Sequence, residues 1–201
     1  NGTGTWALTG SNTYTGATTV SAGILQIGNG ATAGSISTSS AVSISEAGTL
    51  AYNRSDGASP INSFSGGGTL SNLKTGSTLN LSGANLSLFS GTYSVAVDES
   101  TPTPTVAQII FRNTPSLGGN TLSVVTTGYQ SSFPSDLTLF SWNGRATGTP
   151  TLKMNGTIVQ GATVGAGGLL TFASASALTM SPGYLWSLNN NGAMTNSTSG
   201  L

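Results

Sequence analysis

The chain has 201 residues and a formal net charge of zero, with five basic and five acidic side chains and neither histidine nor cysteine. The lack of cysteine and histidine excludes a disulfide framework, a zinc cluster, an iron–sulfur centre, a thiol nucleophile and the usual general base. Five basic residues are too few for the positive surface that nucleic-acid binding requires.

The apolar side chains follow the pattern of short strands along the whole chain. Valine, leucine, isoleucine and aromatic residues are set among threonines, and glycine or serine interrupts the pattern at short intervals. No segment has the spacing of an amphipathic helix, and no apolar run approaches the roughly 18 residues that would span a membrane. Because the chain is almost uncharged, its composition differs from that of disordered segments. We therefore predict an all-β fold.

Two segments of the first 97 residues resemble each other. Residues 8–20 read LTGSNTYTGATTV and residues 81–95 read LSGANLSLFSGTYSV. Gly10 aligns with Gly83, which gives an offset of 73 residues. Because this period is too long for one coil of a solenoid, we expect it to span several coils.

The segment GTGTWALTGSNTYTGATTVSAGILQIGNG, residues 2–30, closely resembles the autotransporter-associated β-strand repeat of bacterial surface proteins. Residues 47–56 and 66–85 are similar to further parts of autotransporter passenger domains, so the resemblance covers roughly residues 2–97. It implies a right-handed parallel β-helix on the outside of a cell, and it brings no catalytic residues with it.

The segment STPTPT marks the domain boundary that we predict. We expect a solenoid-like region over residues 1–97, a Pro/Thr linker over 98–105 and an antiparallel sandwich-like or jelly-roll-like region over 106–201. Alternating proline favours a stiff, extended segment without ladder donors. The alternative is one continuous all-β domain in which this segment is an edge strand or a surface loop.

Hairpin signals are the reason for expecting antiparallel strands in the second half. Asn155-Gly156, between TLKM and TIV, is a strong two-residue hairpin signal because both residues tolerate positive φ. The sequence NNNG links YLWSL to AMTN in a comparable way. Since hairpins are antiparallel, they favour a sandwich or jelly roll over further parallel coils.

The acidic residues give little support for catalysis. They are Glu46, Asp56, Asp98, Glu99 and Asp136. A glycosidase needs two carboxyl groups that face each other across a sugar. Only Asp98 and Glu99 are close in sequence, and neighbours on a strand point to opposite faces. We expect no catalytic residue, no cofactor and no metal site.

Two other patterns have both a binding and a structural interpretation. Residues 53–57, NRSDG, fit a turn in which Asp56 bonds backbone amides and Gly57 supplies positive φ, and a binding loop is the alternative. Five aromatic residues are candidates for stacking on sugars, although such residues more often fill a core. They are Trp6, Tyr14, Tyr93, Trp142 and Trp186.

The scarcity of charge is the most informative feature for function. Soluble monomers use charged surfaces and charged edge strands to stay apart, and this chain has little besides Lys74 and Lys153. Residues 1–10 alternate as a strand does, with Trp6 and Leu8 on one face. The repeat begins at residue 2 without a preceding cap, which a solenoid needs. A processed or excised product is the other explanation for this start.

We therefore expect a non-enzymatic structural protein that is extracellular or on the surface of a bacterium. It would assemble with itself into a fibre or surface layer through strand edges or its N-terminal strand, with Trp6 and Leu8 in the contact. One alternative is a passenger-type adhesin that binds glycans or host surfaces. A more distant alternative is a carbohydrate-active enzyme.

Overall fold

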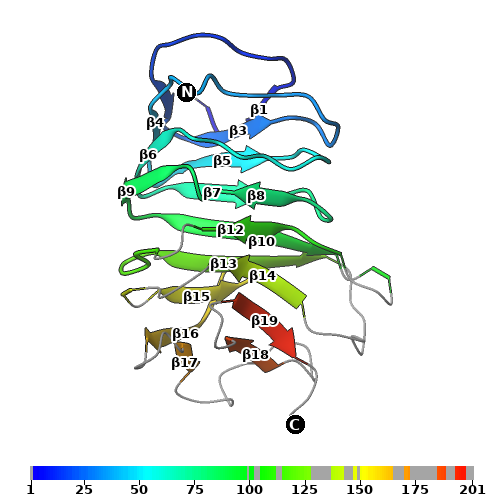
Figure 1. The fold of residues 1–201 in the computed structure, drawn as a ribbon, viewed down its shortest axis with the longest axis vertical. Coiled ribbons are helices and arrows are strands. Elements are labelled where there is room, and N and C mark those ends of the chain that lie inside the picture. Colours follow the sequence, from blue (N-terminus) through cyan, green and yellow to red (C-terminus); the bar gives the residue numbers. More distant parts are fainter. Residues whose placement is uncertain are drawn as a thin grey trace.

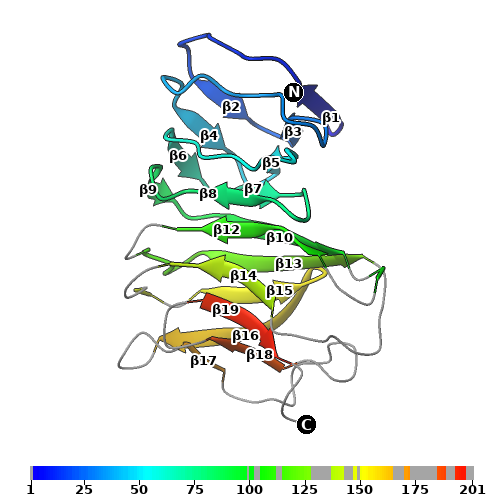
Figure 2. The same cartoon turned by 45° about the vertical axis from the view of Figure 1, so that its right-hand side comes forward.

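The structure is a computed structural model in which strands are stacked into a column (Figures 1 and 2). It describes residues 2–98, 100–101, 105–111, 115–127, 137–142, 147–148, 150–164, 170–172, 185–188 and 193–197. Within these ranges every regular element is a strand, so the expected all-β fold is confirmed. None of the described residues belongs to a helix with the length and apolar character needed to cross a membrane.

The long sheet runs the length of the column. In spatial order it contains β1 (Thr5–Leu8), β3 (Gly23–Ile27), β5 (Gly48–Tyr52), β7 (Thr69–Asn72), β10 (Thr92–Asp98), β13 (Thr121–Thr127), β15 (Thr151–Met154), β16 (Thr157–Val164) and β17 (Leu170–Phe172), with β11 (Thr105–Val106) beside β10. All neighbours from β1 to β15 along this order are parallel.

Two further sheets complete the coils. The short sheet contains β2 (Thr18–Val20), β4 (Val42–Ile44), β6 (Ser63–Gly66) and β9 (Asn85–Phe89). The third sheet contains β8 (Thr78–Asn80), β12 (Gln108–Ile110), β14 (Leu137–Ser141), β19 (Ala193–Ser197) and β18 (Leu185–Leu188). The chain visits the short, long and third sheets in turn, and each return to the long sheet adds a parallel strand. This path is a parallel β-helix.

Equivalent residues of the long sheet are stacked in columns. One column contains Trp6, Leu25, Leu50, Leu70, Tyr93, Leu122 and Leu152. Leu50, Leu70 and Leu122 are each 0% exposed, which identifies the side of the sheet that faces the core. In every strand, the residue before the member of this column points to the opposite face. It is threonine in all seven strands except β3, where it is Ile24.

Glycines stand where the coils approach each other most closely. Gly66 ends β6 with a φ of 96°, and a Cβ at this position would lie 2.2 Å from the carbonyl oxygen of Ile44. A Cβ on Gly91, just before β10, would lie 2.0 Å from the carbonyl oxygen of Gly68. No side chain fits such gaps, so these two glycines allow neighbouring coils to stack at strand spacing.

Buried asparagines satisfy backbone carbonyl groups at the corners of the coils. The Nδ2 of Asn62 donates to the carbonyl oxygens of Ser37 and Ser40, at 2.8 Å each. The Nδ2 of Asn120 donates to those of Phe89 and Gly91, at 3.2 and 3.1 Å. Because a buried polar group without a partner is costly, these side chains allow a chain with few apolar residues to form a closed core.

The segment between residues 98 and 105 does not end the parallel ladder. β10, which precedes it, pairs in parallel with β13, which follows it, from Thr92↔Thr121 to Asp98↔Thr127. The antiparallel pairing expected from residue 106 onward is therefore wrong for β12, β13 and β15, which pair in parallel with β8, β10 and β13. The reason is that β13 and β15 repeat the threonine–apolar alternation of the earlier strands of the long sheet, and β12 places Ile109 beside Leu79. The expected linker includes residues 99 and 102–104, which lie outside the described residues.

The hairpins expected from sequence are present further along the chain. β15 and β16 are antiparallel around Asn155-Gly156, and both turn residues have positive φ, 48° and 81°. β18 and β19 are also antiparallel, and the NNNG segment between them, residues 189–192, lies outside the described residues. Beside the proline segment the short strand β11 pairs antiparallel with β10, but along the order from β1 to β15 the long sheet stays parallel and changes to antiparallel pairing only at residues 155–156.

The 73-residue repeat does not relate equivalent strands. Gly10 follows β1 of the long sheet, whereas Gly83 follows β8 of the third sheet. The structural repeat is instead the coil, whose length varies with its loops. Thr5 and Ile24 are adjacent in the sheet, as are Thr121 and Thr151.

We predict that Leu50→Ala destabilises the protein by about 2–5 kcal/mol, because it leaves a cavity within a fully buried column. Leu88→Ala is the matched control, since Leu88 is 76% exposed on β9, and it is expected to change stability by less than about 0.5 kcal/mol. Urea unfolding followed by circular dichroism measures both. Equal losses for the two variants would contradict the assigned register.

Candidate functional site

The N-terminal strand β1 forms one end of the long sheet. It pairs in parallel with β3, with Trp6 opposite Leu25 and Leu8 opposite Ile27. The amide of Ile24 donates to the carbonyl oxygen of Gly4 at 3.0 Å. Within the described residues no strand pairs with the other side of β1. That side leaves backbone donors and acceptors available to a further strand.

Trp6 stands at the end of the buried column. Its side chain is 74% exposed, although Leu50 and Leu70 in the same column are 0% exposed. Leu8 is half-buried and packs against the core. The two residues are in columns that face the core, as the alternation of residues 1–10 predicts, but Trp6 has no coil above it among the described residues.

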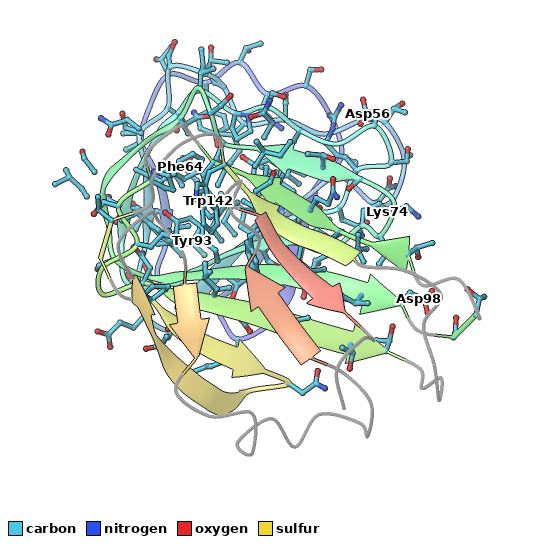
Figure 3. The ribbon with its side chains drawn as sticks, turned by 60° about the horizontal axis from the view of Figure 1, so that its bottom comes forward. Asp56, Phe64, Lys74, Tyr93, Asp98 and Trp142 are labelled. Atoms are coloured by element: carbon cyan, nitrogen blue, oxygen red, sulfur yellow. The ribbon has the colours of Figure 1, made fainter. Side chains whose placement is uncertain are left out.

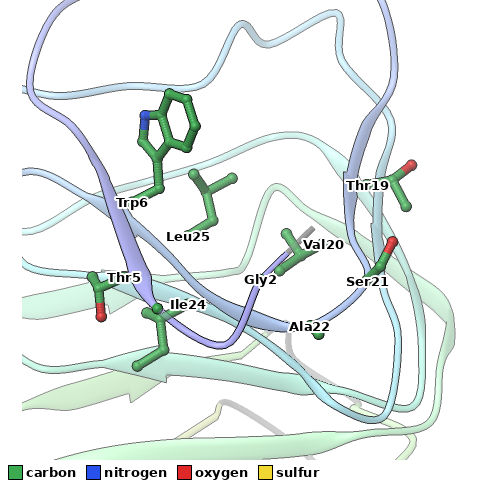
Figure 4. A pocket seen from close by; sticks show the side chains of 10 residues that line it. Gly2, Thr5, Trp6, Thr19, Val20, Ser21, Ala22, Ile24 and Leu25 are labelled. Atoms are coloured by element: carbon green, nitrogen blue, oxygen red, sulfur yellow. The ribbon is translucent and has the colours of Figure 1, made fainter.

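A groove lies beside this edge (Figure 4). It has a volume of about 330 Å³ and is lined on one side by Trp6 and Leu25 and on the other by residues 19–22. Figure 4 shows the indole of Trp6 extending beyond Leu25. The end of the β-helix therefore presents an apolar side chain, a groove and an unpaired strand edge together.

The acidic residues are dispersed. Asp56 forms an ion pair with Arg54 at 2.7 Å. Asp98 accepts a hydrogen bond from the amide of Ser100 at 2.9 Å, and hydrogen bonds from the side chain and backbone of Ser100 lower its pKa. In the part of the chain that the structure describes, no three His, Cys, Asp or Glu residues are grouped as a metal site would require. Glu99 and Asp136 lie outside the described residues.

The segment 53–57 forms a turn that joins neighbouring coils. The Nε of Arg54 donates to Asp56 Oδ1 at 3.1 Å and to the carbonyl oxygen of Gly57 at 3.0 Å, and its Nη1 donates to the carbonyl oxygen of Gly34 in the preceding coil. Gly57 has the expected positive φ, 74°. The carboxylate of Asp56 binds Arg54 rather than the backbone amides that the sequence suggests.

The aromatic candidates divide between core and surface. Tyr93 and Trp142 are 1% and 3% exposed, and Figure 3 shows them in the interior with Phe64. Rings from different parts of the chain are in contact there, since the centroids of Tyr93 on β10 and Phe111, just after β12, are 4.8 Å apart. Trp6 and Tyr14 are exposed. The side chain of Trp186 lies outside the described residues.

A second cleft is lined in part by residues of the segment 53–57, for which the sequence left a binding loop as the alternative to a turn. It has a volume of about 370 Å³ and lies between residues 34–38 of one coil and residues 54–62 of the next. Tyr52, a core residue of β5, is among the residues that line it. The sequence offered only the motif at residues 53–57, which forms part of its wall.

Comparison with known proteins agrees with the resemblance found in the sequence. Residues 1–27 match the family described as passenger-associated-transport-repeat. A segment of 56 residues is 50% identical to a protein named adhesin BmaC autotransporter, from Brucella suis biovar 1 (strain 1330), and covers 28% of this chain and 2% of that protein. The match thus spans a small part of its relative. No solved structure matches the chain.

One match is to a passenger repeat and the other is to a segment of an autotransporter, so the resemblance to passenger repeats is confirmed. The chain carries a bacterial passenger-type repeat, and the location expected from the sequence, outside the cell or on its surface, agrees with both matches.

We predict that stability falls at alkaline pH. Burial raises the pKa of Tyr52 and of Tyr93 above the ordinary value of 10.0. Above about pH 10 the unfolded chain releases these protons while the folded chain retains them, so stability is complete below that pH and decreases as the pH rises. The urea midpoint measured from about pH 8 to 11 tests this. The double variant Tyr52→Phe, Tyr93→Phe is expected to show a flatter profile, and an unchanged slope would contradict the prediction.

Proposed function

We propose that this chain is a non-enzymatic structural segment of a passenger-type bacterial surface protein. The observation that carries the proposal is the ladder of parallel strands from β1 to β15, in which each coil buries the apolar column of the next. The match to a passenger repeat supports it. The dispersed acidic residues of the described ranges support a non-catalytic role.

The N-terminal end is the proposed assembly surface. A strand donated by residues 1–10 fits poorly, because β1 is already paired with β3 along one side. Stacking against the free side of β1 fits better, since it would cover Trp6 and continue the column. In a fibre, this edge would contact the opposite end of another copy, because head-to-tail contacts that do not close generate filaments. β17 is the last strand of the long sheet among the described residues.

Adhesion is the second candidate function. The identity to a segment of a protein named an adhesin favours it. Under this alternative the chain would be a monodisperse module that presents a binding surface for glycans or host surfaces. Electron microscopy and light scattering of the purified chain distinguish a fibre from a monodisperse module.

We predict that Trp6→Ser leaves a folded chain whose self-association is weakened. The loss of a buried aromatic anchor costs about 2 kcal/mol or more, which is roughly 30-fold in the dissociation constant. Sedimentation velocity over a range of concentrations measures this, with circular dichroism as the folding control. Leu88→Ser is the matched control, because Leu88 is as exposed as Trp6 but lies on β9. A wild-type chain that is monomeric at all concentrations would refute assembly, and equal effects of the two variants would refute the role of Trp6.

A further inference from the structure

The second cleft lies where the third face of the β-helix has no strands. The third sheet proper begins at β8, and above it only an isolated bridge, Ala58↔Leu79, continues the pairing. In the preceding coils this face is formed by loops, including residues 34–38 and 54–62. Loops do not pack as closely as paired strands, and a cleft of about 370 Å³ is left between them. Its volume is within the range of small-molecule sites, roughly 300–1,000 Å³.

Tyr52 gives this cleft an unused polar group. The residue is 5% exposed, with its ring in the core. Among the described residues, no group forms a hydrogen bond with its hydroxyl. The hydroxyl oxygen is nevertheless not among the fully buried atoms that lack a partner. The residue lines the cleft. Burial, with Tyr14 nearby, raises the pKa of the phenol. The hydroxyl therefore stays protonated and can both donate and accept a hydrogen bond.

The charges at the cleft cancel. Arg54 and Asp56 line it, and two contacts join their side chains, at 3.1 and 2.7 Å. The guanidinium is also held by the carbonyl oxygens of Gly34 and Gly57. An anionic ligand would compete with Asp56 for Arg54, whereas a neutral ligand can accept from the remaining N–H groups and donate to the exposed carboxylate.

The rest of the wall combines apolar and hydroxyl-bearing side chains. Ile36, Ala58 and Pro60 supply apolar surface, and Ser59 supplies a hydroxyl. The ring of a neutral sugar has the same combination, with C–H groups on its faces and hydroxyls around its edge. Sites for such ligands consist of apolar surface with a few placed polar groups.

We propose that this cleft binds a neutral saccharide unit, with the Tyr52 hydroxyl and the Arg54–Asp56 pair as its hydrogen-bonding groups. The proposal goes beyond the structural role proposed above and is independent of stacking at β1. It gives the adhesive alternative a defined location and ligand class.

The test uses the intact chain and defined probes. Cellotetraose, maltotetraose, chitotetraose and N-acetyllactosamine serve as neutral probes, and tetragalacturonate serves as the acidic comparison. Saturation-transfer NMR detects binding, and titration with amide chemical shifts locates it. We expect at least one neutral probe to bind and to shift the amides of Gly57–Ser59, while those of Asn85–Ser87 on β9 stay unchanged.

Tyr52→Phe removes the hydroxyl and keeps the ring. We expect it to weaken binding of that probe about three- to tenfold, the effect of one hydrogen bond. Tyr93→Phe is the matched control, because it removes a hydroxyl from another buried tyrosine that does not line this cleft, and it is expected to bind as the wild type does. Melting curves confirm that each variant is folded.

The outcomes separate this proposal from the assembly proposal. Binding of tetragalacturonate alone, absence of binding by every neutral probe, or unchanged affinity in Tyr52→Phe would overturn the saccharide site. None of these results bears on sedimentation of the wild type. Conversely, Trp6→Ser is expected to bind saccharide normally, so failure of assembly leaves the site standing.

Discussion

The in-register contact between successive coils is the constraint on which the rest of the structure depends. A single coil cannot bury its apolar side chains or satisfy both edges of its strands, so each coil is stable only against its neighbours. Parallel pairing meets both needs at once, because it repeats the hydrogen-bond ladder and places Leu50 against Leu70 and Leu25. Among the described residues, this contact is missing on the free side of β1 and looser on the third face, where the cleft lies.

The sequence predicts local structure well because strands and hairpins are specified by nearby residues. The Asn155-Gly156 turn and the alternation that places Trp6 and Leu8 together are of this kind. The continuation of the ladder past residue 98 could not be predicted in the same way. The proline segment is a strong local signal, whereas the pairing of β10 with β13 depends on the shared phase of residues far apart in the chain. Because the loops differ in length, equivalent residues of successive coils are not separated by a constant number of residues. A search for a fixed period therefore does not detect the shared alternation.

The two candidate sites differ in how far the sequence reveals them. The edge at β1 follows from an uncharged alternating segment, so Trp6 could be singled out before the fold was known. The cleft follows from the lack of strands on one face of the first coils that the structure describes, and the sequence marks only part of its wall, through the motif at residues 53–57. Tyr52 has the sequence signature of an ordinary core residue in GTLAY, and only the three-dimensional path of the neighbouring loops leaves its hydroxyl without a partner among the described residues.

The scarcity of charge has a consequence for specificity. Charged residues normally help to fix strand register and to block unwanted edge pairing, but in this chain, apart from the contact of Arg54 with the preceding coil, the register of the described strands comes from shape and from uncharged hydrogen bonds. Gly66 and Gly91 permit close approach only at their own positions, and Asn62 and Asn120 fix the carbonyl groups at the corners. Among the described residues, neither kind of contact, the close approach at glycine or the asparagine hydrogen bond, is made on the free side of β1. Under the assembly that we propose, a strand that meets this edge would be selected by its backbone and by its fit to Trp6, and the indole would be the side chain that imposes a register there.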